Sequence, residues 1–383
     1  MKIGGQSEYM KNHMIPWKIL SAVMAVALVA VSVGWAMTAN RTFKPTAEKQ
    51  PASTADTASA MQHSSVGGEK RKLIIDTDSG ADDASALMMA AKDENIEILG
   101  VTVSEGNVSL QQAVETALMT LEMTGSDAPV YAGAETTYTG KHRDIFSVFG
   151  KDGMGDQKLI HPTRKAADGN AVDFILDTVK SNPGEVEIVA LGPVTNLARA
   201  FDKDPETMKK VRRYWSMGTT GFGNGNATPV AEFNVYHDAE AYKVFTESGV
   251  PITALGLDMM DDEVLMSKAW LDCLEEKGGL SEFIAKSFSG LVNFNLNARG
   301  AAVADNPDSV CMACVLWDGF MQETEECHAS VQTLDNETYG EVILYKKGYG
   351  YDTGVTFDDY SFSVVTKINS KIFREKLEAV LAE

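Results

Sequence analysis

Four aspartates crowd one short stretch near residue 80, and their spacing raises the first chemical question. The segment 72–87 reads KLIIDTDSGADDASAL, so an apolar run is followed at once by Asp76, Asp78, Asp82 and Asp83. At ~4 Å and an effective dielectric constant of about 20, each close pair of carboxylates repels by about 4 kcal/mol. Either solvent in an open loop or a bound cation must offset this repulsion.

Short apolar runs alternate with helical patterns along the chain after residue 71. The predicted strands cover 72–76, 96–104, 128–133, 185–191, 211–218 and 251–257. The predicted helices cover 82–93, 109–124, 170–181, 195–201 and 238–247. This alternation predicts right-handed β-α-β units and an α/β fold, with a mostly parallel sheet covered by helices on both faces.

Oxygen-bearing groups follow the predicted strands, at the point where each strand ends. Besides the four aspartates they are Glu105, Asn107, the Leu191 segment with Asn196, the polar stretch 219–234 and Asp258. In open parallel sheets, ligands bind outside the carboxyl ends of the strands. This convergence favours a site over a solvated loop. Because the set holds neither His nor Cys, its oxygens favour Ca²⁺ or Mg²⁺ over Zn²⁺ or Cu²⁺.

The segment 224–234, NGNATPVAEFN, is the second informative stretch. Asn226, Glu232 and Asn234 offer two amides and a carboxylate, which suit the vicinal hydroxyls of a sugar. Asn-Gly pairs also form turns, and we prefer that interpretation for residues 224–225 alone. Glu232 and Asn234 would share a face if this segment is extended, and we expect them to act in binding.

The chain resembles the inosine/uridine-preferring nucleoside hydrolases across several ordered motifs. DTDSGADDASAL matches their signature DxDxGxDDAxAL, and the other matching motifs are EGN (105–107), ALGPVTNLA (190–198), GNATPVAEFN (225–234) and GLD (256–258). The order and spacing match over roughly 72–382. The resemblance implies a Rossmann-like nucleoside hydrolase fold and a Ca²⁺-dependent enzyme that splits nucleosides into ribose and free base.

The resemblance also implies roles for individual residues. Its calcium ligands correspond to Asp78, Asp83, the backbone carbonyl of Leu191, and Asp308, with Asp305 as a competing choice for the last. Asp78 also matches the proposed base for the metal-bound water, and Asp76 is expected to support the ligands. The expected substrate contacts are Asp82, Asn107, Asn226, Glu232, Asn234 and Asp308.

The leaving-group side departs from the family pattern. Pro307 and Phe149 stand where many members carry His. Some purine-preferring members instead stack aromatic rings on the base, so the departure predicts a purine preference. Phe149, Phe222 and Phe294 are candidates for stacking, with ordinary packing as the alternative for each. His142 is a possible substitute acid, with a surface loop position as the alternative.

Two rival functions differ from this one in class. A haloacid-dehalogenase-type phosphohydrolase also begins with a strand and DxD, but Gly80 stands where such enzymes usually carry Thr or Val. An exported non-catalytic nucleoside- or ribose-binding protein on the same scaffold is motivated by Pro307 and Phe149. The aspartates and Asp308 argue against the second rival, because they would retain a metal and a placed water.

The composition of the N-terminal residues predicts where the folded domain begins. The 19 residues 19–37 are uncharged and follow three lysines, so 1–39 is predicted to be a signal peptide or membrane anchor of an exported protein. Residues 40–70 are rich in Ser, Thr, Ala and Pro and predict a disordered linker, which leaves 71–383 as the nucleoside hydrolase domain. A net charge of −20 argues against a nucleic-acid partner.

Partners are therefore expected to be a small nucleoside, the membrane only through the N-terminal segment, and further copies of the chain. The resemblance implies a homodimer or homotetramer. The four cysteines leave any disulfide open, and Cys311 and Cys314 are expected to be small buried hydrophobes rather than metal ligands.

Overall fold

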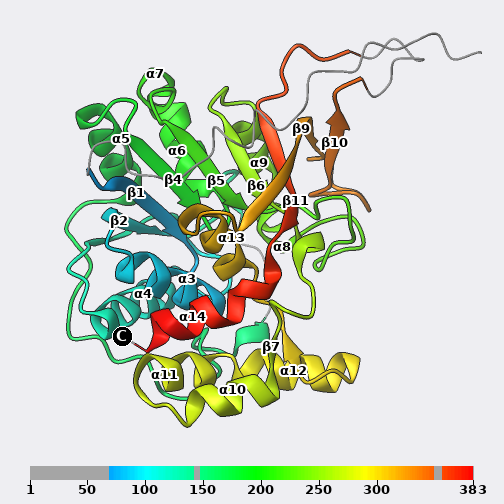
Figure 1. The fold of residues 1–383 in the computed structure, drawn as a ribbon. Coiled ribbons are helices and arrows are strands. Elements are labelled where there is room, and N and C mark those ends of the chain that lie inside the picture. The colour runs from blue at the N-terminus through cyan, green and yellow to red at the C-terminus, as the bar shows by residue number, and fades with distance from the viewer. Residues whose placement is uncertain (1–68, 142–146, 349–355, 383) are drawn as a thin grey trace, which may run out of the picture. The chain divides into compact units, whose positions relative to one another are not determined.

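The computed structural model describes residues 69–141, 147–348 and 356–382 (Figure 1). Within these residues nine strands form one sheet in the order β10-β9-β11-β6-β5-β4-β1-β2-β3. The strands of this sheet are β1 (Arg71–Thr77), β2 (Ile96–Val103), β3 (Val130–Ala132), β4 (Val186–Ala190), β5 (Arg213–Met217), β6 (Ile252–Leu255), β9 (Met321–Val331), β10 (Val342–Lys346) and β11 (Phe362–Ile368). A two-stranded sheet joins β7 (Met266–Ser267) to β8 (Val303–Ala304).

The helices connect and cover these strands. The α-helices are α3 (Ala81–Lys92), α4 (Leu110–Thr124), α5 (Ala171–Ser181), α6 (Thr195–Lys203), α7 (Pro205–Met208), α8 (Phe233–His237), α9 (Ala239–Thr246), α10 (Lys268–Glu275), α11 (Gly279–Ser287), α12 (Ser289–Arg299), α13 (Pro307–Leu316) and α14 (Phe373–Leu381). Short 3₁₀ helices are η2 (Ser147–Phe149), η3 (Leu257–Met259) and η5 (Ser370–Ile372).

Strand β1 is an interior strand of the sheet; it lies between β2 and β4 and pairs with both in parallel. Its side chains are apolar on both faces, as strands buried between two helical layers require. Leu73 and Ile75 pack into one core cluster, and Ile74 packs into the other. The sheet therefore has one core on each face.

Helices α3, α4 and α13 belong to the first cluster, whereas α5, α6 and α9 belong to the second. The parallel pairing runs without interruption from β3 to β6 and on to β11. The predicted α/β fold, a mostly parallel sheet with helices on both faces, is confirmed.

The C-terminal part adds the antiparallel strands, which the sequence patterns did not predict. β11 pairs in parallel with β6 and antiparallel with β9, and β9 pairs antiparallel with β10 at the edge of the sheet. All four cysteines are free, and Cys311 and Cys314 are buried in α13 as expected.

The predicted membrane segment 19–37 and linker 40–70 fall outside the described residues, apart from residues 69 and 70. In the described parts of the chain, no helix combines the length and apolar character needed to span a membrane.

Candidate active site

Three carboxylates meet where α3 and α13 begin, at the carboxyl end of β1. Asp82 and Asp83 lie in the first turn of α3, and Asp308 lies in the first turn of α13. One oxygen from each lies within 4.8 Å of the others, and all three residues are at most 5% exposed. Buried charges at this spacing need a compensating cation or proton.

Asp83 is the most firmly oriented of the three. Its Oδ1 accepts a hydrogen bond from Thr77 Oγ1, and its Oδ2 accepts from the backbone N of Gly80 at 2.7 Å. Asn107 Nδ2 donates to the same Oδ2 at 3.4 Å, which links the loop after β2 to the start of α3. These bonds fix the carboxylate before any ligand binds.

Asp78 follows β1 and is fully buried, but it lies outside the group of three. Its Oδ2 accepts from the backbone N of Asn107 at 2.6 Å, whereas its Oδ1 has no partner. A Cβ atom at Gly106 would lie 2.0 Å from Asp78 Oδ2, and one at Gly192 would lie 2.7 Å from Oδ1. Only glycine at these two positions leaves room for the carboxylate.

The electrostatics of this region disfavour ionised carboxylates in the absence of a cation. Burial, followed by the charge of Asp83, raises the pKa of Asp78 and of Asp82 well above the ordinary value. Burial, followed by the charge of Asp82, does the same to the pKa of Asp308. The unpartnered Oδ1 atoms of Asp78 and Asp82, together with an all-oxygen donor set, fit a hard cation such as Ca²⁺ or Mg²⁺.

Asp76 supports this group from within the sheet. Its Oδ1 accepts from Thr102 Oγ1 at 2.5 Å and from Asn196 Nδ2 at 2.9 Å, and burial raises its pKa to about 7. Its side chain therefore joins β1, β2 and α6.

The backbone carbonyl of Leu191, the predicted ligand after β4, has a partner in this structure. It accepts a hydrogen bond from Asn234 Nδ2 at 2.7 Å. The backbone N of Leu191 donates to Asp76 O at 2.8 Å, which ties this turn to β1.

The segment before α9 folds differently from the extended form considered for it. Glu232 is the N-cap of α8, and its carboxylate accepts from the backbone N of Asn234 at 2.9 Å and of Val235 at 3.2 Å. Asn234 is inside that helix, so the two side chains do not alternate as in a strand. The reason is this cap, which competes with extended structure. Burial raises the pKa of Glu232 to about 7.

A cavity of about 230 Å³ brings most of the predicted residues together. Its wall contains Asp82, Asn107, Leu191, Asn226, Glu232, Asn234 and Asp308. Asp78 and Asp83 lie behind this set and are not wall residues. Asp305 also lines the cavity, but its carboxylate is paired with Arg299 at 3.9 Å, and it is absent from the group of three.

The wall of the cavity also contains apolar side chains. Val148, Phe149, Leu257, Leu291 and Phe294 line it. Phe222 does not line this cavity; its ring instead lies 4.2 Å from Lys346 Nζ. His142 falls outside the described residues.

Sequence reasoning missed Arg299 and Asn295, which both line the cavity from α12. The only available signal was their helical spacing of four residues, which places two side chains on one face.

The comparisons with known proteins agree with this geometry. The profile of the family described as inosine-uridine preferring nucleoside hydrolase matches residues 73–375. This chain belongs to that family. As a nucleoside hydrolase, it is an enzyme that cleaves nucleosides at the N-glycosidic bond, so the phosphohydrolase alternative is wrong.

Relatives and solved structures extend the match over most of the chain. The pyrimidine-specific ribonucleoside hydrolase RihB of Escherichia coli is 34% identical over 286 residues, which cover 73% of this nucleoside hydrolase and 89% of the relative. A plant nucleoside hydrolase superposes with a TM-score of 0.74 at 29% identity, covering 82% of this chain and 99% of the other. A purine-preferring ribonucleoside hydrolase from Gardnerella vaginalis superposes with a TM-score of 0.73 at 25% identity, covering 82% and 98%.

Proposed function

We propose that this nucleoside hydrolase is Ca²⁺-dependent and prefers purine ribonucleosides, which it converts to ribose and free base. The observation that carries the proposal is the group formed by Asp82, Asp83 and Asp308, because two of its members line a cavity that also exposes amide and carboxylate groups. Such a wall can hold a cation and a sugar at the same time.

Asp83, Asp308, Asp78 and the carbonyl of Leu191 would hold the ion. Bound there, Ca²⁺ would offset the carboxylate charges and lower the pKa of the water that attacks C1′ of the sugar. Asp78 is the proposed base for that water, because its Oδ1 has no protein partner. Unlike a carboxylate at the protein surface, it is held in place by the backbone N of Asn107.

The ribose is proposed to lie between the two sets of polar residues. Asp82 and Asn107 face it from the β1 and β2 side, and Asn226, Glu232 and Asn234 face it from the α8 side. Cleavage passes through an oxocarbenium-like state, and carboxylates close to the anomeric carbon stabilise its positive charge.

The base is proposed to lie against the apolar side chains of the cavity wall. The relatives differ in their named preference, since the E. coli enzyme is pyrimidine-specific and the G. vaginalis enzyme is purine-preferring. Phe149 and Phe294 in the wall support a purine, because larger rings gain more from aromatic contact. Arg299 in the same wall can stabilise negative charge on the leaving base.

The test measures ribose release from inosine, adenosine, guanosine, uridine and cytidine, with Ca²⁺ and with a chelator. We expect release that requires Ca²⁺, is faster for the three purine nucleosides, and is lost in Asp83→Asn. Asp272→Asn is the matched control, because Asp272 is an exposed helical aspartate paired with Lys268. Faster release from uridine and cytidine would contradict the purine preference, and full activity in chelator would contradict the calcium requirement.

We further propose that the protein is exported and forms homo-oligomers. The support for export is the uncharged segment 19–37 with its preceding lysines. Cell fractionation, with and without residues 1–39, tests export, and light scattering of the purified protein tests assembly.

A further inference from the structure

Helix α13 connects the proposed metal group to the opposite edge of the sheet. Asp308 is in its first turn and Val315 is in its last. The seven residue steps from one to the other span about 10 Å of helix. Eight of its ten residues are buried, so it runs through the core rather than along the surface. A shift of this helix along its axis would therefore move Asp308.

The group of three carboxylates works against this placement of α13. Asp308 approaches Asp82 and Asp83, which both belong to α3. Ser309 Oγ donates to Asp82 O across the two helices in a long bond of 3.4 Å, and the carboxyl groups of Asp83 and Asp308 also share a hydrogen bond. When these carboxylates are ionised and no cation is bound, they repel one another across the α3–α13 contact, and apolar packing between the helices must resist that repulsion.

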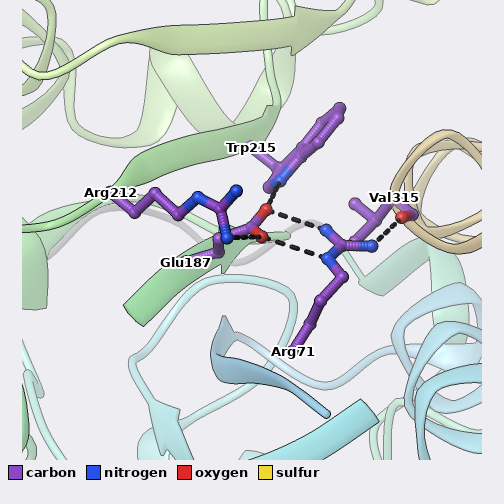
Figure 2. A network of polar contacts seen from close by, with 5 residues as sticks. All are labelled: Arg71, Glu187, Arg212, Trp215 and Val315. Carbon is purple, nitrogen blue, oxygen red and sulfur yellow. Dashed lines mark hydrogen bonds and ion pairs between the residues drawn. The ribbon is translucent and has the colours of Figure 1, made fainter. Parts of the chain in front are cut away.

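The other end of α13 carries a strong polar contact. Arg71 Nη1, at the start of β1, donates to Val315 O at 2.6 Å. Val315 O is one of the last four carbonyls of the helix, which have no partner within it, and the positive guanidinium also suits the negative end of the helix dipole. Figure 2 shows that this arginine reaches both Val315 and Glu187.

Glu187 fixes the guanidinium in turn. Arg71 Nε and Nη2 donate to Glu187 Oε1 and Oε2 at 3.0 and 2.8 Å, a bidentate pair whose side chains are 11% and 7% exposed. Trp215 Nε1 donates to the same carboxylate at 2.8 Å (Figure 2). The contact thus joins the beginnings of β1, β4 and β5 to the end of α13.

We propose that Arg71 and Glu187 are positioning residues that hold α13 at its C-terminal end, so that Asp308 stays beside Asp82 and Asp83 before a cation binds. This inference rests on the proposed function, since it assumes that these carboxylates bind Ca²⁺. Arg71 and Glu187 touch neither the ion nor the substrate; they act through the helix.

The test compares Ca²⁺ binding by calorimetry in the full chain and in Arg71→Met/Glu187→Gln, which removes both charges of the bidentate pair and so leaves neither of these two groups as an unpaired buried ion. We expect the Kd for Ca²⁺ to rise about tenfold, as is found when partners that orient metal ligands are lost. Ribose release at saturating Ca²⁺ should stay within about threefold of the parent, because the bound ion itself then holds Asp308 in place.

Arg212→Met is the matched control. Arg212 Nη1 lies 3.9 Å from Glu187 and its side chain is 61% exposed, so its loss leaves the Arg71 contact intact and the Kd unchanged. Should the double variant fail to fold, Arg71→Lys gives the same measurement, because one ammonium group cannot reproduce the fork that bridges Glu187 and Val315.

An unchanged Kd with a lower melting temperature in chelator would overturn the proposal, because it would assign these residues to stability alone. Loss of ribose release that excess Ca²⁺ does not restore would also overturn it. Absence of Ca²⁺ binding in the parent itself would overturn the proposed function, and this result is distinct because it precedes any substitution.

Discussion

Carboxylates are buried both at the edge of the sheet where the parallel strands begin and at the edge where they end, but only the first has a counter-charge supplied by the protein. At the edge where the strands begin, Glu187 is paired with Arg71 and accepts from Trp215. Burial would raise its pKa, yet these contacts bring the pKa of Glu187 below the ordinary value. At the edge where the strands end, Asp82 and Asp308 crowd together and burial raises the pKa of both.

The difference shows where the protein supplies its own counter-charge and where it does not. A buried carboxylate with a built-in arginine stabilises the fold and stays ionised. Buried carboxylates without one destabilise the empty protein, and they gain most from a cation that arrives from solution. We call the edge where the strands begin, with Arg71 and Glu187, the structural edge. We call the edge where the strands end, with Asp82 and Asp308, the chemical edge.

The largest expected effect tests the chemical edge. Asp78→Asn keeps the size of the side chain but removes the proposed base, so kcat for nucleoside cleavage should fall by about 10²–10⁴-fold. Initial rates at saturating nucleoside and Ca²⁺ measure this. Glu187→Gln, at the other edge, should retain kcat within a few-fold under the same conditions. Equal losses in the two variants would erase the distinction between the edges.

The next effect is on stability and belongs to the structural edge. Glu187→Gln leaves the buried Arg71 guanidinium without its counter-charge, so the free energy of unfolding should fall by about 3–5 kcal/mol at pH 7. Because the folded pKa of Glu187 is lowered, its contribution is present above the unfolded value of about 4.3 and is lost as pH falls through the folded pKa. Denaturant titrations at pH 7 and pH 4 should therefore show the smaller loss at pH 4.

Glu232 should show the opposite pH dependence, with a smaller effect. Burial raises the pKa of Glu232 to about 7, so ionising this carboxyl lowers the free energy of unfolding. The contribution of the protonated form is fully present below the unfolded pKa and is lost as pH rises through about 7. Glu232→Gln should raise the free energy of unfolding by up to about 3 kcal/mol at pH 8, where the parent is ionised, and change it little at pH 4. A stabilisation that does not grow between these two pH values would refute the assignment.

The smallest effect concerns the apolar side chains of the cavity wall. Phe294→Ala should raise KM for inosine by about two- to twelvefold, since an aromatic contact contributes about 0.5–1.5 kcal/mol. Phe222→Ala is a closely matched control, because the exposed fractions of the two rings are 43% and 45% but only Phe294 lines the cavity. Steady-state kinetics on both variants decide whether position in the wall, rather than exposure, determines the result.

The sequence predicted the chemical edge better than the structural edge. Asp82, Asp83 and Asn107 could be brought together from the sequence, because the strands and the helix that position them were predicted from periodicity. Asp308 lies in α13, which was not among the predicted helices. Asp308 lies more than 220 residues from Asp82. Periodicity alone does not bring such distant residues together, and only the resemblance to a family joined them.

Other features lay beyond local patterns. The cap made by Glu232 depends on two backbone N–H groups that become available only when α8 forms. The pairing of Arg71 with Glu187 joins positions 116 residues apart, and neither residue is distinctive in its own segment. The antiparallel strand β9 was not predicted because charged residues interrupt its apolar alternation.

The two glycines beside Asp78 set a limit on how this chain can vary. At Gly106 and Gly192 even a methyl group would displace the carboxylate, since the Cβ positions fall 2.0 and 2.7 Å from its oxygens. The backbone conformation does not require glycine at either position, because neither residue has a positive φ. In a library of random variants, substitutions at these two positions should be depleted by selection for activity and tolerated far better by selection for folding. The two glycines are thus required for the reaction although they carry no functional group.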